Sequence, residues 1–265
     1  MKRWLLPLLF VALPAAAQPT NTVTYNFTNP PLWDLSGPYQ RSGEVSFFTG
    51  SSTTVLTQSV TGAVSGTFAD NDTNTLVGQG VSESGTVTGN VAGTNGTAQI
   101  TVQWSWLDDG EYEGKAYTVS DHMSVSGSVS AASPELALTF KAHVCFQSAA
   151  FREFNGCTNV HGSWNASLAT NMTGHWSLQL TNLTDADNIL SGSAVLTLSN
   201  GRALEYSVTG RYHPSSATQS ATLTLTGTGD ATGTHLNLTT TGPQLELKTL
   251  AGHVLGQKLR FTSSE

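Results

Sequence analysis

Apolar and polar side chains alternate along most of this chain. Ile100, Val102 and Trp104 share one face of such a stretch, and the same pattern returns over residues 136–146 and 204–225. A period of two residues is typical of β-strands that bury one face. No stretch has a convincing 3.6-residue period, and turn residues recur about every 8–12 positions, as in sandwiches and barrels. The pattern predicts an all-β fold, an antiparallel meander that is a β-sandwich or barrel-like.

A short motif, Ser-Val-(Ser/Thr)-Gly, occurs at residues 59–62, 124–127 and 207–210. The two later copies lie in alternating stretches that run into a polar break with a proline, so they indicate a strand, a turn and a return strand. This repetition allows two similar lobes, residues 18–170 and 171–265. Gly210 stands on the apolar face of its copy, where a residue without a side chain indicates a bend or a close crossing by a neighbour.

Three segments are predicted from local composition. The region 55–91 is rich in Gly, Ser and Thr, which weakens its predicted strands. Residues 107–114 are expected to form a hairpin loop. Residues 148–154 are the only stretch that favours a helical turn.

The first 17 residues have the features of a signal peptide. Lys2 and Arg3 precede an apolar run, and Ala15-Ala16-Ala17 is a small-residue cleavage site. We therefore expect cleavage near Ala17 and a secreted, periplasmic or cell-envelope location. Removing Lys2 and Arg3 takes the formal charge from −7 to −9. An acidic chain without clustered cations is a poor partner for nucleic acid.

The two cysteines of this exported chain, Cys145 and Cys157, are expected to form a disulfide bond. Their spacing lacks the Cys-x-x-Cys pattern of zinc sites. The seven histidines likewise form no His-x-His or His-Glu-x-x-His pattern. Four of them fall on the polar faces of predicted strands: His122, His143, His175 and His235.

Acidic residues offer the candidate catalytic groups. Asp108, Asp109, Glu111 and Glu113 lie close together in the predicted hairpin loop, and Asp121 falls on an apolar face between Val119 and Met123. Two carboxyl groups about 5–10 Å apart are what glycoside hydrolysis needs. Four acids on an exposed loop, however, lack the apolar surroundings that raise the pKa of a general acid. A solvated loop is the favoured interpretation.

Asp70, Asp72 and Asn74 match the first half of a calcium-binding loop, with oxygen ligands at alternate positions. The glycine and the final glutamate of such a loop are missing, so an Asx-rich turn is favoured over a structural calcium ion. No other cofactor is expected.

The tryptophans bear on carbohydrate binding, which uses solvent-facing aromatic side chains. Trp104, Trp106, Trp164 and Trp176 lie with apolar neighbours, which favours the core. Trp33, Tyr39 and Tyr112 are expected in loops and remain the aromatic candidates for a sugar platform.

The sequence favours a secreted or cell-envelope β-sheet protein with a structural, adhesive or ligand-binding role and without enzymatic activity. Its partner would be a surface glycan or an envelope protein. The alternatives are an exported glycan hydrolase that uses carboxylates of residues 108–121 and an outer-membrane β-barrel.

Overall fold

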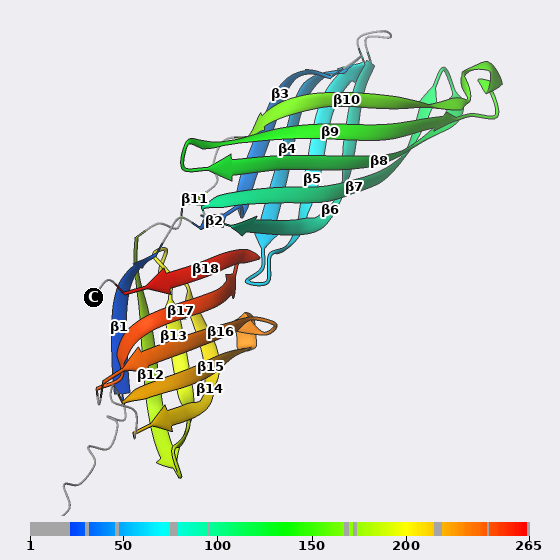
Figure 1. Ribbon diagram of the computed structural model, residues 1–265. Coiled ribbons are helices and arrows are strands. Elements are labelled where there is room, and N and C mark those ends of the chain that lie inside the picture. The colour runs from blue at the N-terminus through cyan, green and yellow to red at the C-terminus, as the bar shows by residue number, and fades with distance from the viewer. Residues whose placement is uncertain are drawn as a thin grey trace, which may run out of the picture.

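The computed structural model shows an all-β chain (Figure 1). It describes residues 22–29, 32–45, 48–74, 79–94, 96–166, 170–171, 174–214, 219–242 and 244–263. The predicted signal peptide lies outside these ranges. Within the ranges, the strands form a 16-stranded sheet and a two-stranded sheet. No helix in the part of the chain described here has the length and apolar character needed to cross a membrane.

The strands from β3 to β10 form what we call the first half. They run in sequence order, and each pairs antiparallel with the next. The strands are β3 (Gly37–Val45), β4 (Phe48–Gln58), β5 (Ala63–Asn74), β6 (Gln79–Thr94), β7 (Thr97–Tyr112), β8 (Lys115–Ser130), β9 (Ser133–Gln147) and β10 (Gly156–Ala166).

The remaining strands of the large sheet form the second half. Its order is β1-β12-β13-β14-β15-β16-β17-β18, so the first strand of the chain pairs with a strand from its middle. The strands are β1 (Thr22–Asn29), β12 (Gly174–Ala186), β13 (Ile189–Thr197), β14 (Ala203–His213), β15 (Ser220–Thr228), β16 (His235–Thr241), β17 (Glu246–Val254) and β18 (Gln257–Thr262).

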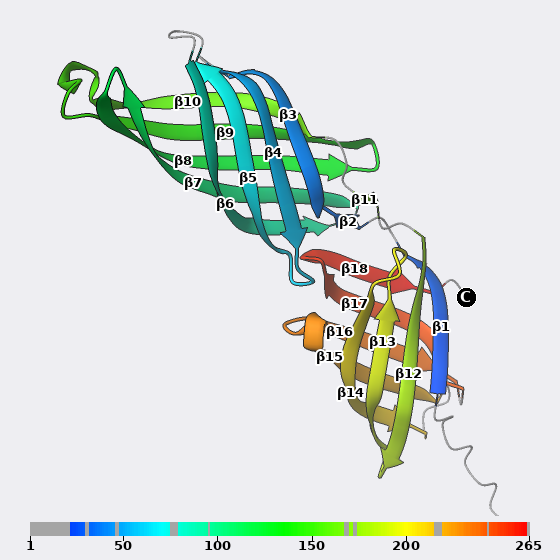
Figure 2. The ribbon, with the colours of Figure 1, turned by 180° about the vertical axis from the view of Figure 1, so that it is seen from behind.

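Each half curls upon itself, as Figures 1 and 2 show from opposite sides. The curl brings β10 close to β3 in the first half and β18 close to β1 in the second. Within the described residues no ladder joins either pair of strands, so both curls stay open. The predicted all-β fold with an antiparallel meander is confirmed.

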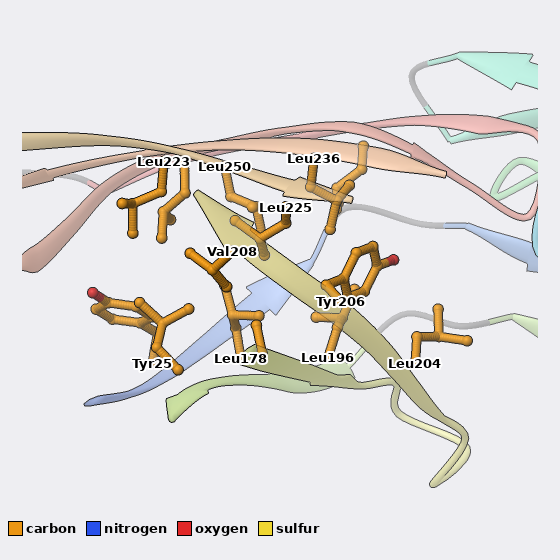
Figure 3. Packing of buried hydrophobic residues seen from close by; sticks show 14 of the residues in the cluster. Tyr25, Leu178, Leu196, Leu204, Tyr206, Val208, Leu223, Leu225, Leu236 and Leu250 are labelled. Carbon is orange, nitrogen blue, oxygen red and sulfur yellow. The ribbon is translucent and has the colours of Figure 1, made fainter. Parts of the chain in front are cut away.

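The core of the second half lies inside its curl. Figure 3 shows Tyr206 and Val208 of β14 facing leucines from the strands around them. Burying a leucine side chain contributes about 1.5–3 kcal/mol. The outward positions of the same strands carry residues such as Thr209 and Thr224, which are exposed. Alternation therefore separates an apolar interior from a polar exterior, as the sequence predicts.

A separate cluster fills the first half, and it includes Phe68, Ile100, Trp104 and Phe140. The Phe68 and Trp104 rings stack with centroids 4.8 Å apart. Strands β4, β5 and β6 form across the described part of the Gly-rich region, where the sequence predicts strands only weakly.

The chain passes between the halves twice, and the two passages pair with each other. β2 (Trp33–Asp34) follows β1, β11 (Thr170–Asn171) precedes β12, and together they form the small sheet. The division into lobes at residue 170 stays a prediction, to which the structure adds that β1 packs in the second half. Tyr25 and Phe27 of β1 belong to that half's core.

The turn between β4 and β5 joins the two halves. Its Val60 is 3% exposed and lies in the core of the second half. The carbonyl oxygen of Gly62 accepts a 2.7 Å hydrogen bond from the Val91 amide. A Cβ atom on Gly62 would lie 2.5 Å from the Cα of Gly256 in the β17–β18 turn, so this contact requires glycine. The first copy of the sequence motif is therefore a turn rather than a strand.

Two further sequence predictions are wrong. Trp33 and Tyr39 are only 1% and 5% exposed instead of facing solvent from loops. The Trp33 indole donates to the Gly96 carbonyl, and the Tyr39 hydroxyl donates to that of Leu35, so each buried polar atom is satisfied within the fold. Residues 107–112 continue β7 instead of forming a loop, because β8 pairs with them as far as Lys115.

Candidate functional site

The end of the first half farthest from β18 carries a loop closed by a disulfide bond (Figure 1). Cys145 of β9 lies directly opposite Cys157 of β10, and their sulfurs are bonded. The predicted disulfide is confirmed. We call residues 145–157 the disulfide loop. It contains a 3₁₀ turn, η1 (Arg152–Phe154), within the stretch for which a helical turn is predicted.

The tip of the β7–β8 hairpin lies beside this loop. Glu111 pairs with Ala116 near the end of the ladder, and Glu113 and Gly114 form the turn with φ of 52° and 73°. Positive φ at both central residues is the geometry of a tight hairpin turn whose twist matches that of the strands. The ladder thus carries the hairpin out to the level of the disulfide loop.

Ser148 fastens the disulfide loop to the hairpin tip. Its hydroxyl donates a 2.8 Å hydrogen bond to the carbonyl oxygen of Ala116. The hydroxyl oxygen of Ser148 in turn accepts hydrogen bonds from the amides of Ala150 and Phe151 at 3.2 and 3.3 Å. The Ser148 amide donates to the side-chain oxygen of Asn155 at 2.7 Å. These bonds tie the loop to the hairpin tip and join its beginning to Asn155 near its end.

Aromatic side chains strengthen the same contact. The Tyr117 and Phe146 rings stack with centroids 5.5 Å apart and planes 26° apart. The Lys115 ammonium lies 4.9 Å from the centre of the Phe151 ring, within the range of a cation–π interaction. The hairpin and the loop are therefore joined by polar and aromatic contacts together.

An open pocket of about 900 Å³ lies between the hairpin tip and the disulfide loop. This volume is within the range of small-molecule sites. Tyr117 and Phe146 supply aromatic surface, and Glu111 and Arg152 supply one charge of each sign. The complete lining is Glu111, Ala116, Tyr117, Thr118, Cys145, Phe146, Gln147, Ser148, Ala149, Arg152, Asn155, Gly156 and Cys157.

Of the predicted acidic candidates, the structure brings Glu111 to this pocket. Asp108 and Asp109 pair with Val119 and Thr118 in the ladder, and Asp121 pairs with Val144, but the side chains of these three lie outside the described residues. Among the described lining residues Glu111 is the only carboxylate. Glycoside hydrolysis needs two.

The calcium candidates lie in a strand. Asp70, Asp72 and Asn74 belong to β5 and pair with Ser52, Gly50 and Phe48 of β4. In an extended strand these alternate positions line one face in a row, about 7 Å apart along the strand, whereas a calcium loop wraps its ligands around the ion. The three side chains lie outside the described residues, and the calcium site stays a prediction.

The tryptophans whose side chains the structure describes are buried and offer no surface to a sugar. Trp104 and Trp176 are in the core as predicted, at 3% and 1% exposure, while the side chains of Trp106, Trp164 and Tyr112 lie outside the described residues. The aromatic pair of the pocket was missed by sequence reasoning. The sequence features that pointed to this place are the acidic candidate Glu111 and the helical-turn signal at residues 148–154 inside the predicted disulfide loop.

In comparisons with protein-family models, with curated proteins and with solved structures, the chain matched none of them.

Proposed function

We propose that this is an exported, non-enzymatic β-sheet protein that binds a surface glycan with the pocket between its disulfide loop and its β7–β8 hairpin. The observation that carries the proposal is the fastened loop. Ser148 and the disulfide hold the pocket wall in place before any ligand arrives. Such preorganisation reduces the entropy lost on binding.

The chemistry of the lining supports a neutral polar ligand. Glu111 and Arg152 are both exposed and together contribute no net charge. Gln147 and Asn155 offer amide groups that can donate and accept hydrogen bonds. Tyr117 and Phe146 are half-buried and offer ring surface for the apolar side of a sugar. A neutral oligosaccharide matches this combination better than a highly charged ligand.

The polar side chains on the outer face of the sheet support the proposal that this face is in contact with water. Its outward positions carry polar residues, Thr209 and Thr224 among them, while its leucines face inward. A sheet that faced hydrocarbon would carry its apolar side chains outside. With the predicted signal peptide, this favours a location beyond the cytoplasm. Sequencing the amino terminus of the exported protein should begin at Gln18.

The test of glycan binding is an array of neutral and acidic oligosaccharides probed with the mature chain. We expect neutral members to bind, and Arg152→Ala and Glu111→Ala each to weaken that binding about tenfold, the effect of losing one hydrogen bond to a charged group. Glu205→Ala and Arg211→Ala, which each remove one exposed charge from the second half, are the matched controls. An array without bound members, or equal losses in both pairs of variants, would refute the proposal.

The alternative function is glycan hydrolysis, and of its candidate carboxylates Glu111 lines the pocket. Incubating each bound oligosaccharide with the wild-type chain and with Glu111→Gln separates the two functions. Intact sugar after prolonged incubation supports binding alone, and hydrolysis that Glu111→Gln abolishes would establish the enzyme instead.

A further inference from the structure

Four polar residues form a row across the outer face of the first half, on β7, β8, β9 and β10. Ser105 pairs with His122, His122 pairs with His143, and His143 pairs with Asn159. All four are exposed. The sequence predicts that His122 and His143 lie on polar faces, and the register shows in addition that they are direct cross-strand neighbours.

Direct opposition places the two histidines at metal-binding separation. Residues directly opposite in an antiparallel pair have Cβ atoms about 4.5–5.5 Å apart. Imidazole nitrogens bind zinc at about 2.0–2.1 Å, so two rings from such positions can reach one ion between them. The backbone of β8 and β9 fixes this separation before any metal binds.

The hydrogen bonds of the two rings leave one nitrogen of each for a ligand. Nδ1 of His143 donates to the side-chain carbonyl oxygen of Asn159 at 3.0 Å, and Nδ1 of His122 lies 3.3 Å from the Ser105 hydroxyl oxygen. A proton on Nδ1 of His143 leaves the lone pair of its Nε2 available. Metal-binding histidines are commonly oriented in this way by an oxygen on the other ring nitrogen.

The neighbours on the same face define the chemistry of the site. On one side is the Cys145–Cys157 disulfide, whose sulfur atoms lie within 4.8 Å of a ring nitrogen of His143. Oxidised sulfur offers no thiolate, so the ligands of the oxidised protein are the two imidazoles and water. On the other side are Lys141 and His161, which pair with each other. The Lys141 ammonium weakens cation binding by repulsion.

We propose that His122 and His143 bind one divalent transition-metal ion through Nε2, with Asn159 and Ser105 orienting the rings. Neutral imidazole selects zinc, nickel and copper ions over magnesium and calcium. This site lies on the outer face of the sheet and does not depend on the proposed glycan binding.

Isothermal titration of the mature, oxidised chain with Zn²⁺, without reductant, tests the proposal. We expect His122→Ala and His143→Ala each to weaken zinc binding at least tenfold, and Asn159→Ala to weaken it by about tenfold through loss of ring orientation. His175→Ala with His213→Ala is the matched control, because those exposed histidines pair with Thr28 and Ser220 rather than with each other. The control should bind zinc within twofold of the wild type, and Mg²⁺ should give no heat.

A wild-type chain that takes up no zinc would overturn the proposal. So would equal affinities for the wild type and His143→Ala, since zinc would then be held elsewhere. All substituted positions are exposed, and a circular dichroism melt that matches the wild type confirms that a weakened variant is folded.

Discussion

The side-chain amide of Gln257 pairs with both backbone groups of Trp33. The Trp33 amide donates to Oε1 at 3.0 Å, and Nε2 donates to the Trp33 carbonyl at 2.7 Å. Both residues are 1% exposed. Gln257 is the first residue of β18 and pairs with Gly93 of β6. Its side-chain amide therefore links β2, in the segment between the two halves, to β18 at the edge of the second half.

Gln257→Leu should therefore weaken the junction. The substitution keeps the side-chain size but removes the hydrogen bonds of Gln257 to the amide and carbonyl of Trp33, and an unsatisfied buried group costs about 1–3 kcal/mol. Urea denaturation should show a loss of about 3 kcal/mol in the free energy of unfolding. Lys258→Leu, at the exposed neighbouring position, is the control and should change stability by less than about 0.5 kcal/mol. Equal midpoints for the two variants would contradict the role of Gln257.

Gly210→Val should damage folding rather than binding. A Cβ atom at Gly210 would lie 2.2 Å from the carbonyl oxygen of Thr222 and 2.8 Å from the Cα of Leu223, so the backbone of β15 would have to move. Overpacking of this kind costs about 1–3 kcal/mol. A thermal melt should show a lower Tm, while Thr209→Val, at an exposed position beside it, should leave the Tm nearly unchanged. An unchanged melt for Gly210→Val would show that β14 and β15 have room to separate.

Removing the disulfide should destabilise the end of the first half that carries the disulfide loop. Cys145 and Cys157 have a sequence separation of 12. Closing a loop of that size lowers the entropy of the unfolded chain, which stabilises the folded state by about 3 kcal/mol at room temperature. The double variant Cys145→Ala with Cys157→Ala should lose about that much stability against urea. Reduction of the wild type should give the same shift and leave the double variant unaffected. A double variant as stable as the oxidised wild type would mean that Ser148 alone holds the loop.

Ser148→Ala should expose the disulfide loop to protease. The variant loses the hydrogen bond to the Ala116 carbonyl and the acceptor for the amides of Ala150 and Phe151. Arg152 is exposed in the middle of the loop and offers a trypsin site. Mass spectrometry should detect cleavage after Arg152 several times faster in Ser148→Ala than in the wild type. Ser120→Ala, an exposed serine on β8, should be cleaved at the wild-type rate, and equal rates for all three chains would refute the fastening role.

Alkaline pH should unfold the protein through its buried tyrosines. Burial raises the pKa of Tyr25, whose hydroxyl donates to the Leu245 carbonyl at 2.6 Å, and it raises the pKa of Tyr39 as well. The unfolded chain releases these protons near pH 10 while the folded chain retains them. Stability is therefore fully present below about pH 10 and falls as the pH rises further. Tyr25→Phe should start less stable but fall less steeply above pH 10. Parallel curves would contradict the contribution of Tyr25.

Some features were determined by the sequence alone because they depend on neighbours along the chain. The alternation that places Tyr206 and Val208 inside and Thr209 outside is a property of one strand. The disulfide followed from two cysteines in a chain predicted to be exported, and the exposure of His122 and His143 followed from the polar faces they occupy. The inferences from alternation need the period of the strand but not the identity of its partner strand, and the disulfide needs neither.

The tertiary structure decided which strands and faces meet. Alternation has the same period in every strand, so it cannot state that β1 pairs with β12 or that His122 lies opposite His143. Trp33 is buried because the second half supplies Gln257 to satisfy its backbone. The pocket lies where Ser148 donates to the carbonyl of Ala116, 32 residues earlier in the chain. Contacts between distant residues depend on register and chain path, which no local pattern encodes.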